Sequence, residues 1–224
     1  EKTYEATLRL GMKTDTQDIT GTVLEERPVT VTELDILNVL PAFRGEILQI
    51  PPMYSALKVN GQKLYDLARK GKKVERQPRP ITIHELELLH FDGQDARIRV
   101  RCSKGTYIRT LCEDMGEKLG CLGCMAALRR TRAGEYTIEK AVPLQTLLDA
   151  ENPEQYLLSM DSPFLGYPAV ILSENQEKRC RNGNSFTRPL PDGTYRAYGK
   201  DGTFLMLAKV ENGVMETVKS FFEV

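Results

Sequence analysis

The chain has 224 residues, 41% of them hydrophobic and 28% charged, as expected of a globular protein with a sizeable core. No apolar run approaches the roughly 20 residues that span a bilayer. The first twenty residues alternate polar and apolar, unlike a signal peptide. We therefore expect neither an apolar membrane segment nor a signal peptide.

The formal net charge of zero conceals a strong segregation of charge along the chain. Residues 53–80 carry eight Lys or Arg against two acidic residues, and residues 97–132 carry nine against three. Concentrated positive charge is what a polyphosphate partner such as RNA requires. A single charged segment, however, more often forms only a solvated surface.

The five cysteines are an odd number and lie mostly in apolar patterns, which favours reduced thiols in a cytoplasmic protein. Cys121 and Cys124 have the CxxC spacing of half a zinc site or of a redox pair. The two histidines, His84 and His90, lie upstream without a matching spacing. We therefore expect no metal, and interpret the CxxC pair as a tight turn before a helix.

In chain order, the first predicted element is a strand. Residues 2–10 alternate in the manner of a half-buried strand, which directs Tyr4 toward a core or cleft. A polar loop follows at 14–21 and contains Asp15 and Asp18. Two carboxylates could perform acid–base chemistry, but aspartates in a Thr- and Gly-rich loop usually serve the turn itself.

The next segments predict short helices. Thr32, with Asp35 three residues later, predicts a capped helix. Residues 62–70 predict a second helix ended by Gly71. That helix lies within the basic stretch 53–80, which we expect to project as an RNA-gripping loop.

The clearest strand, 95–102, leads through a glycine turn into a predicted helix at 107–119. This corner brings together backbone N–H groups, Lys104, Tyr107 and Arg109. Helix N-termini favour anions, and arginine binds carboxylate or phosphate bidentately. The same pattern also fits an ordinary surface corner, and the arginine-rich run after Leu128 equally fits phosphate contacts or a solvated helix end.

The last part of the chain predicts a small β-rich module. Ser173 begins a capped helix, and three strands are predicted near 195–198, 204–210 and 214–222. The Asp-Gly and Asn-Gly pairs between these strands are strong hairpin signals. We expect a barrel-like arrangement.

Four motifs in this order resemble the bacterial tRNA pseudouridine-55 synthase family. They lie within residues 2–142, and the tail resembles the family's C-terminal RNA-binding module more loosely. The motifs are Lys2–Ala6 with Leu10–Asp18 and Gly21; Gln49–Lys58 with Gly61; Leu64-Tyr65 with Ala68-Arg69 and Gly71; and Cys102–Arg109 with Leu119-Gly120 and Leu128–Thr131.

The resemblance implies an α+β fold. A mixed or antiparallel sheet would form an incomplete pseudouridine-synthase core over 1–150, and a PUA-like barrel module would follow over 160–224. It also implies that the T-loop uridine of tRNA is flipped out and converted to pseudouridine through a new C-glycosidic bond. No metal or organic cofactor is expected. The expected partner is tRNA, without a membrane or an obligatory protein partner, and the protein would be a cytoplasmic monomer.

Residue by residue, the resemblance makes Tyr4 the tyrosine that stacks on the target base. Tyr107 and Leu128 would line the same pocket, and Arg109 would pair with the catalytic aspartate. Tyr4 and Arg109 are thus the expected supporting catalytic residues. The expected RNA contacts are Lys58, Lys63, Arg69, Lys70, Lys72, Lys73, Lys104, Arg129 and Arg130.

The sequence departs from the family pattern at the nucleophile. The family's Gly-Thr-Leu-Asp motif occurs nowhere in the 224 residues, and the chain starts at Glu1 inside strand-like sequence. We therefore expect an N-terminally truncated synthase that is inactive alone, and assign neither Asp15 nor Asp18 as a replacement. Two alternatives stay open: a non-catalytic protein that binds structured RNA, and a relative of the guide-RNA-dependent pseudouridylases. A zinc or redox protein is a more distant alternative.

Overall fold

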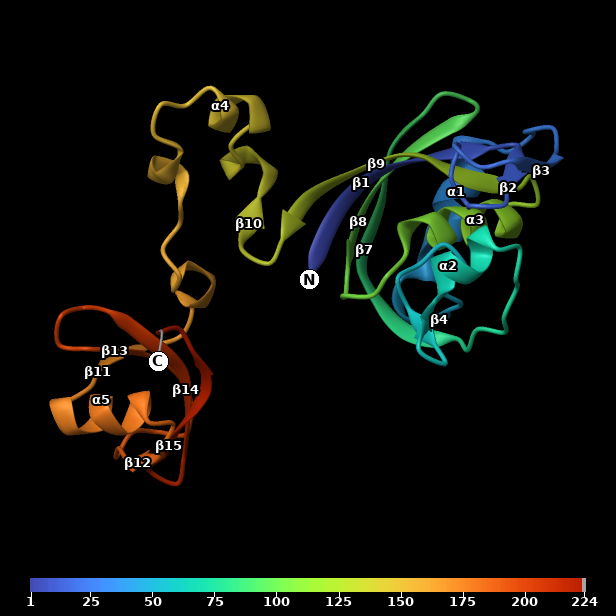
Figure 1. The fold of residues 1–224 in the computed structure, drawn as a ribbon. Helices are drawn as coiled ribbons and strands as arrows, with labels where there is room; N and C mark the ends of the chain where they lie inside the picture. Colours follow the sequence, from blue (N-terminus) through green and yellow to red (C-terminus); the bar gives the residue numbers. More distant parts are fainter. Residues whose placement is uncertain (223–224) are drawn as a thin grey trace. The chain divides into compact units, whose positions relative to one another are not determined.

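The computed structural model describes residues 1–222, and the chain divides into two compact units, Glu1–Ala141 and Val142–Val224. Each unit has its own buried core. Figure 1 shows the ribbon of the helices and strands in both units. The first unit consists of β1 (Lys2–Leu10), β2 (Met12–Thr14), β3 (Val23–Glu26), α1 (Glu33–Val39), the 3-10 helix η1 (Leu40–Phe43), β4 (Gly45–Gln49), β5 (Lys58–Val59), β6 (Gln62–Lys63), α2 (Leu64–Arg69), β7 (Arg79–Phe91), β8 (Asp95–Cys102), α3 (Ile108–Lys118), β9 (Gly123–Ala133), β10 (Tyr136–Thr137) and η2 (Ile138–Lys140). The second consists of α4 (Leu144–Leu148), η3 (Pro153–Tyr156), η4 (Ser162–Phe164), β11 (Ala169–Ile171), α5 (Glu174–Arg181), β12 (Phe186–Thr187), β13 (Gly193–Tyr198), β14 (Phe204–Glu211) and β15 (Val214–Ser220).

The first unit is built on a six-stranded sheet in the order β10-β9-β1-β8-β7-β4, with antiparallel neighbours throughout. The predicted alternation of β1 is confirmed, because Ala6, Leu8 and Leu10 are buried. The alternation of β8 is confirmed in the same way. Helices α1, α2 and α3 lie on one side of this sheet (Figure 1). The α+β class with an antiparallel sheet is therefore correct.

The opposite face of the sheet is covered by ion pairs. Arg97 and Arg99 both pair with Glu5, and Arg99 also pairs with Glu87. Arg101 pairs with Glu1 and Glu85. The charge surplus counted along residues 97–132 is therefore partly neutralised in space by acidic residues from neighbouring strands.

Helix α3 packs unusually close to β9 because two glycines meet. A Cβ atom on Gly116 would lie 2.2 Å from the backbone nitrogen of Gly123 and 2.3 Å from the carbonyl carbon of Leu122. The apolar face of the helix, with Leu111 and Met115, is fully buried against the sheet. This packing fixes the helix whose first turn carries Arg109.

Three segments differ from the prediction. The run after the CxxC pair is the strand β9 rather than a helix, because it pairs with β1 along the sheet. Arg79 and Pro80, at the end of the stretch expected to project as a loop, begin the long strand β7. The helix predicted at 62–70 is α2, which starts at Leu64, and the hairpin β5–β6 precedes it; the RNA-gripping role of the stretch 53–80 stays a prediction.

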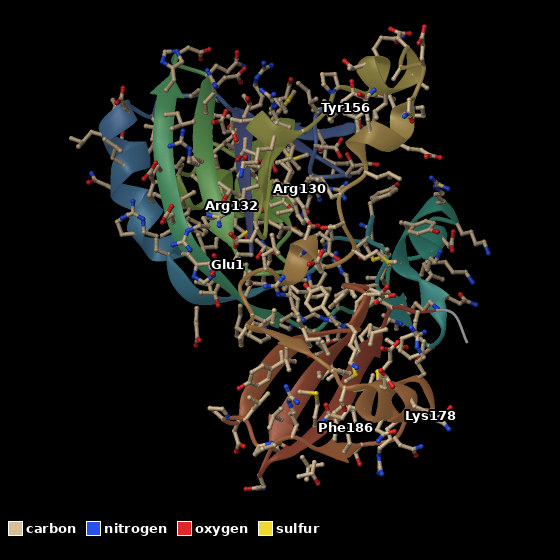
Figure 2. All side chains as sticks on the ribbon, turned by 90° about the vertical axis from the view of Figure 1, so that its left-hand side faces the viewer. Glu1, Arg130, Arg132, Tyr156, Lys178 and Phe186 are labelled. Carbon is tan, nitrogen blue, oxygen red and sulfur yellow. The ribbon has the colours of Figure 1, made fainter. Side chains whose placement is uncertain are left out.

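The second unit contains a five-stranded sheet in the order β11-β13-β14-β15-β12, with α5 beside it (Figure 1). The capping box of Ser173 and Gln176 is confirmed, as are the three predicted strands. Lys178 and Phe186 mark this unit in Figure 2, on α5 and β12. The tail is thus a small curled β-sheet module.

Candidate active site

A sharp corner between β8 and α3 positions the residues at the start of the helix. Gly105 adopts φ +86°, a left-handed conformation that favours glycine, and the hydroxyl of Thr106 donates to the Ser103 carbonyl over 3.0 Å. Tyr107 is the N-cap residue, and Ile108 starts the helix. Arg109 therefore lies in the first turn, as predicted.

Arg109 joins two loops that are far apart in the sequence. Its Nη1 donates to Asp18 Oδ2 over 3.1 Å, and its Nη2 donates to the Tyr54 carbonyl over 2.9 Å. The side chains of Arg109 and Asp18 are 25% and 17% exposed, so the ion pair is partly shielded from water. The guanidinium thus fixes the polar loop 14–21 and the basic stretch 53–80 to the N-terminal end of α3.

Asp18 is arranged as a counter-ion. Its Oδ1 accepts hydrogen bonds from the Thr16 hydroxyl (3.1 Å), the Thr20 hydroxyl (2.5 Å) and the Thr20 backbone N–H (3.1 Å). Burial by itself raises the pKa of Asp18, but hydrogen bonds from Thr20, Thr16 and Arg109 outweigh it and hold the pKa below its ordinary value. Asp18 is therefore ionised at neutral pH and well placed to orient Arg109.

Gln17 attaches the same loop to α3. Its Oε1 accepts from the Thr110 hydroxyl over 2.8 Å, and its Nε2 donates to the Glu113 carboxylate. The residue has φ +64°, a left-handed conformation unfavourable for a residue with a Cβ. Gln17 and Asp18 together therefore attach the polar loop 14–21 to the first two turns of α3.

Tyr4 and Leu128 lie on neighbouring strands of the sheet. Tyr4 of β1 is opposite Val100 of β8 and Arg130 of β9, and Leu128 is opposite Ala6. Burial raises the pKa of Tyr4, and Arg130 only partly offsets it, so the phenol stays neutral. Leu128 is 45% exposed, which leaves its side chain available to a ligand.

The four expected pocket residues lie on β1, on β9 and at the start of α3. Tyr4 packs against the cluster that contains Ile108, the residue between Tyr107 and Arg109. Helix α3 packs against both β1 and β9. Within residues 1–222, no hydrogen bond joins Tyr4 or Leu128 directly to Tyr107 or Arg109. That these four residues line one pocket stays a prediction.

The nine expected RNA-contacting cations share two properties. All are exposed, and none forms an ion pair with a carboxylate in the described part of the chain. The ammonium of Lys63 and the guanidinium of Arg69 lie 5.3 and 5.5 Å from the ring centroid of Tyr65. Unlike the arginines of β8, these cations have no carboxylate partner, which suits contacts with phosphates.

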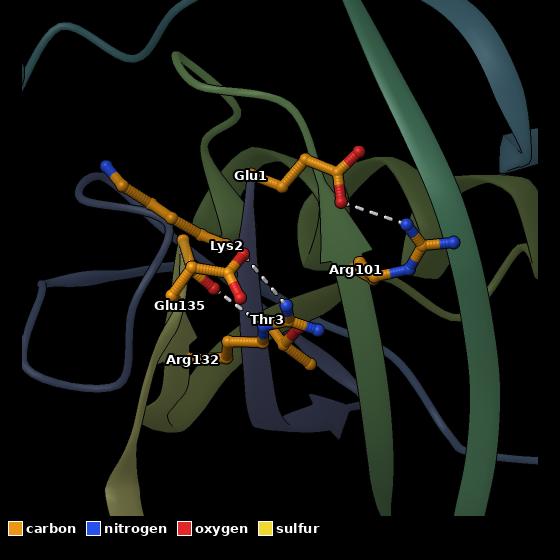
Figure 3. Close-up of a pocket in the computed structure, with 7 residues that line it drawn as sticks. Glu1, Lys2, Thr3, Arg101, Arg132 and Glu135 are labelled. Atoms are coloured by element: carbon orange, nitrogen blue, oxygen red, sulfur yellow. Dashed lines mark hydrogen bonds and ion pairs between the residues drawn. The ribbon is translucent and has the colours of Figure 1, made fainter. Parts of the chain in front are cut away.

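A separate hollow of about 160 Å³ lies at the start of β1 (Figure 3). Its two arginines are engaged, because Arg101 pairs with Glu1 and Arg132 pairs with Glu135. Arg130 and Arg132 both lie on β9, two positions apart (Figure 2). Arg132 forms a salt bridge with Glu135, whereas the side chain of Arg130 is hydrogen-bonded to Tyr4.

The cysteines of the CxxC pair are both buried. Burial raises the pKa of Cys121, and it raises that of Cys124 to about 11. Among residues 1–222 there is no group of three or more His, Cys, Asp or Glu side chains arranged to hold a metal ion. These thiols behave as small apolar side chains between α3 and β9.

Sequence reasoning missed the roles of Asp18 and Gln17. The resemblance pairs Arg109 with a catalytic aspartate whose motif this sequence lacks, so that pairing stays a prediction; among the described residues Arg109 pairs with Asp18. The Thr-Asp-Thr-Gln-Asp run was itself part of a recognised motif, but its partners on α3 lie more than ninety positions away. Spacing along the chain gives no signal for such a contact.

Comparison with known proteins agrees with this architecture. Residues 1–108 match the family model of the TruB family pseudouridylate synthase N-terminal domain, and residues 109–164 match the tRNA pseudouridylate synthase B C-terminal domain. tRNA pseudouridine synthase B of Pseudomonas fluorescens (strain Pf0-1) is 48% identical over 218 residues, which cover 94% of this chain and 72% of that protein. The Clostridium kluyveri protein of the same name is 39% identical over 227 residues, covering 99% and 78%.

Solved structures share the fold. A chain in a Cbf5-Nop10-Gar1 complex aligns with a TM-score of 0.67 and 22% identity, covering 99% of this chain and 66% of that chain. A chain in an H/ACA RNP bound to a substrate RNA containing 2'-deoxyuridine gives a TM-score of 0.67, 20% identity and the same coverage. The fold and the motifs are those of a pseudouridine synthase, an RNA-modifying isomerase. The chain belongs to the TruB family.

No helix among the described residues is long and apolar enough to cross a membrane.

Proposed function

We propose that this chain recognises the T-arm of tRNA and holds the T-loop uridine for isomerisation to pseudouridine. The observation that carries the proposal is the Arg109 corner. A guanidinium held by Asp18 and by the Tyr54 carbonyl lies at the start of α3, beside Tyr107. A base inside a folded loop must be flipped out to reach such a site, and aromatic side chains are suited to stack on it.

Tyr4, Tyr107 and Leu128 form the walls that receive the flipped base, and Arg109 orients the reacting groups. The nine unpaired cations contact the phosphates on either side. Phosphate contacts fix the position of the RNA, while the pocket selects the base. The protein acts as a monomer in the cytoplasm without an obligatory protein partner, and the curled C-terminal sheet is a second RNA-binding surface.

The 224-residue chain binds the RNA but does not convert its uridine to pseudouridine. The Gly-Thr-Leu-Asp motif that supplies the family's nucleophile is not among these 224 residues. Asp18 does not replace it, because both of its oxygens accept hydrogen bonds and Oδ2 is paired with Arg109. A chain that positions the target uridine but has no nucleophile binds the RNA without reacting with it.

The test compares two RNA hairpins of equal length, a T-arm and an anticodon arm, in fluorescence anisotropy titrations at fixed salt. The proposal predicts tighter binding of the T-arm. Equal affinity for both hairpins would instead support the non-catalytic binder of structured RNA. The guide-RNA-dependent alternative has less support, because the curated relatives named above are tRNA pseudouridine synthases B and the likeness to Cbf5 is one of fold.

A further inference from the structure

We propose that Gln49 is a positioning residue: it sets the place of Tyr107, and through Tyr107 the capture of the target base. The role in RNA recognition rests on the proposed function above. The contact itself rests on geometry alone. Gln49 is the last residue of β4 and lies 58 positions before Tyr107.

A single side-chain amide satisfies both backbone groups of Tyr107. Oε1 of Gln49 accepts a hydrogen bond from the Tyr107 N–H over 2.8 Å, and its Nε2 donates to the Tyr107 carbonyl over 3.0 Å. Gln49 is only 2% exposed, one of four buried polar residues among those described. A buried amide with both ends paired is strongly fixed in orientation, because any other orientation leaves polar groups unpaired.

Tyr107 is the residue at which the chain turns from loop into helix. It has φ −101° and ψ 108°, an extended conformation, and its side chain makes no capping hydrogen bond. Its carbonyl also accepts from the Leu111 N–H over 3.1 Å, which begins the helix. By holding both groups of this residue, Gln49 fixes the backbone from which the tyrosine ring projects and the start of the turn that carries Arg109.

Tyr107 borders a hollow in the surface of the first unit. Tyr107, Leu57 and Pro80 line a hollow of about 450 Å³, together with Arg79 and Lys104. Neither of these two cations forms a salt bridge with any residue in the described range 1–222. An aromatic wall beside two unpaired cations suits a nucleotide, so a shift of Tyr107 alters recognition while the cations remain in place.

The Gln49→Glu variant separates positioning from packing, because the two side chains have nearly the same shape. As a carboxylate the new side chain accepts from the Tyr107 N–H but cannot donate to the Tyr107 carbonyl. As a carboxylic acid it does both. Burial beside a carbonyl raises the pKa of the introduced group above about 4.3. The contact with Tyr107 is therefore weakened at neutral pH and restored in acid.

The first measurement is NMR of the Tyr107 amide in the 224-residue chain. In Gln49→Glu this resonance should titrate with the introduced carboxyl and approach the wild-type position in acid. The control is Gln62→Glu, which places the same charge on an exposed residue and should leave Tyr107 unchanged. If Gln49→Glu does not fold, slow hydrogen exchange of the Tyr107 amide in wild type still tests the contact. An amide that ignores the substitution, or exchanges like an exposed loop, overturns the proposal.

The second measurement uses a T-arm hairpin with 5-iodouridine at the target position, photocrosslinked to the chain and mapped by mass spectrometry. At neutral pH, Gln49→Glu should lower the crosslink yield at Tyr107 by about tenfold. Hairpin affinity should change by less than about threefold, because the phosphate contacts are untouched. The yield should recover in acid. An unchanged yield overturns the positioning role, whereas failure of wild type to bind the hairpin overturns the proposed function and leaves the amide result intact.

Discussion

Arg109 donates a hydrogen bond to Asp18, which lies 91 positions earlier in the sequence, and this ion pair holds the polar loop 14–21 against the first turn of α3. Both side chains are less than one-third exposed, and Asp18 accepts three further hydrogen bonds from Thr16 and Thr20. The pair is therefore a structural device for the orientation of the guanidinium, with a measurable pH dependence.

Asp18→Asn should lower the free energy of unfolding at neutral pH by about 1–3 kcal/mol, because it leaves Arg109 without its counter-ion. The pKa of Asp18 lies below the ordinary 3.8: burial raises it, and the hydrogen bonds outweigh burial. Stability from a carboxyl with a lowered pKa is complete above the unfolded value and is lost as pH falls through the folded value. Urea unfolding should thus show a difference between wild type and variant that shrinks below pH 3.8; an equal difference at all pH values would contradict it.

Gln17 combines a useful side chain with a strained backbone. Its contacts with Thr110 and Glu113 are lost in both Gln17→Ala and Gln17→Gly, but glycine relieves the φ of +64°. Gln17→Gly should therefore be more stable than Gln17→Ala by about 1 kcal/mol. Thermal unfolding of the two variants tests the order. An alanine variant as stable as the glycine variant would show that the backbone here carries no strain.

Close packing of α3 on β9 predicts a large effect from one methyl group. Gly116→Ala places a Cβ within 2.2 Å of the backbone of Gly123, which a side-chain rotation cannot relieve. The free energy of unfolding should fall by about 1–3 kcal/mol. Gly166→Ala is the control, because nothing lies within 4 Å of its added Cβ. Equal denaturation curves for the two variants would refute the close approach.

The distinction between paired and unpaired cations predicts which charges control RNA binding. Lys72 and Lys73 are exposed and without salt bridges in the described residues, whereas Arg97 and Arg99 pair with acidic residues on the sheet. Replacing both lysines with alanine should reduce the slope of log affinity against log salt by up to about 1.8, since each phosphate contact contributes about 0.9. Arg97→Gln with Arg99→Gln should leave the slope nearly unchanged. The reverse order would show that RNA lies on the other face.

Regular alternation of polar and apolar residues made β1, β8 and the C-terminal strands predictable. Strands β7 and β9 were not predicted, because their pairing with neighbouring strands is irregular. In β7 the buried positions shift from Ile81 and Ile83 to Leu86, because the register with β8 slips between Ile83 and Glu85. A bulge of this kind breaks the period of two. In β9 four consecutive residues, 127–130, are exposed and two register shifts interrupt the pairing with β1, so no alternation exists to detect.

The candidate site was predictable only where a motif carries it. Tyr4, Tyr107, Arg109 and Leu128 follow from the family resemblance, and their pocket role stays a proposal. The partners that hold the corner in place, Asp18 and the two glutamines, depend on contacts between distant segments. No pattern within one segment encodes such a contact, because it exists only once the sheet and α3 have assembled.

The most direct test of the central claim combines binding and chemistry in one sample. The 224-residue chain is mixed in excess with a T-arm hairpin, complex formation is confirmed by anisotropy, and the recovered RNA is assayed for pseudouridine. We predict a salt-sensitive complex and no pseudouridine, because the pocket residues are present and the nucleophile's motif is not. Pseudouridine formed by this chain would contradict the account.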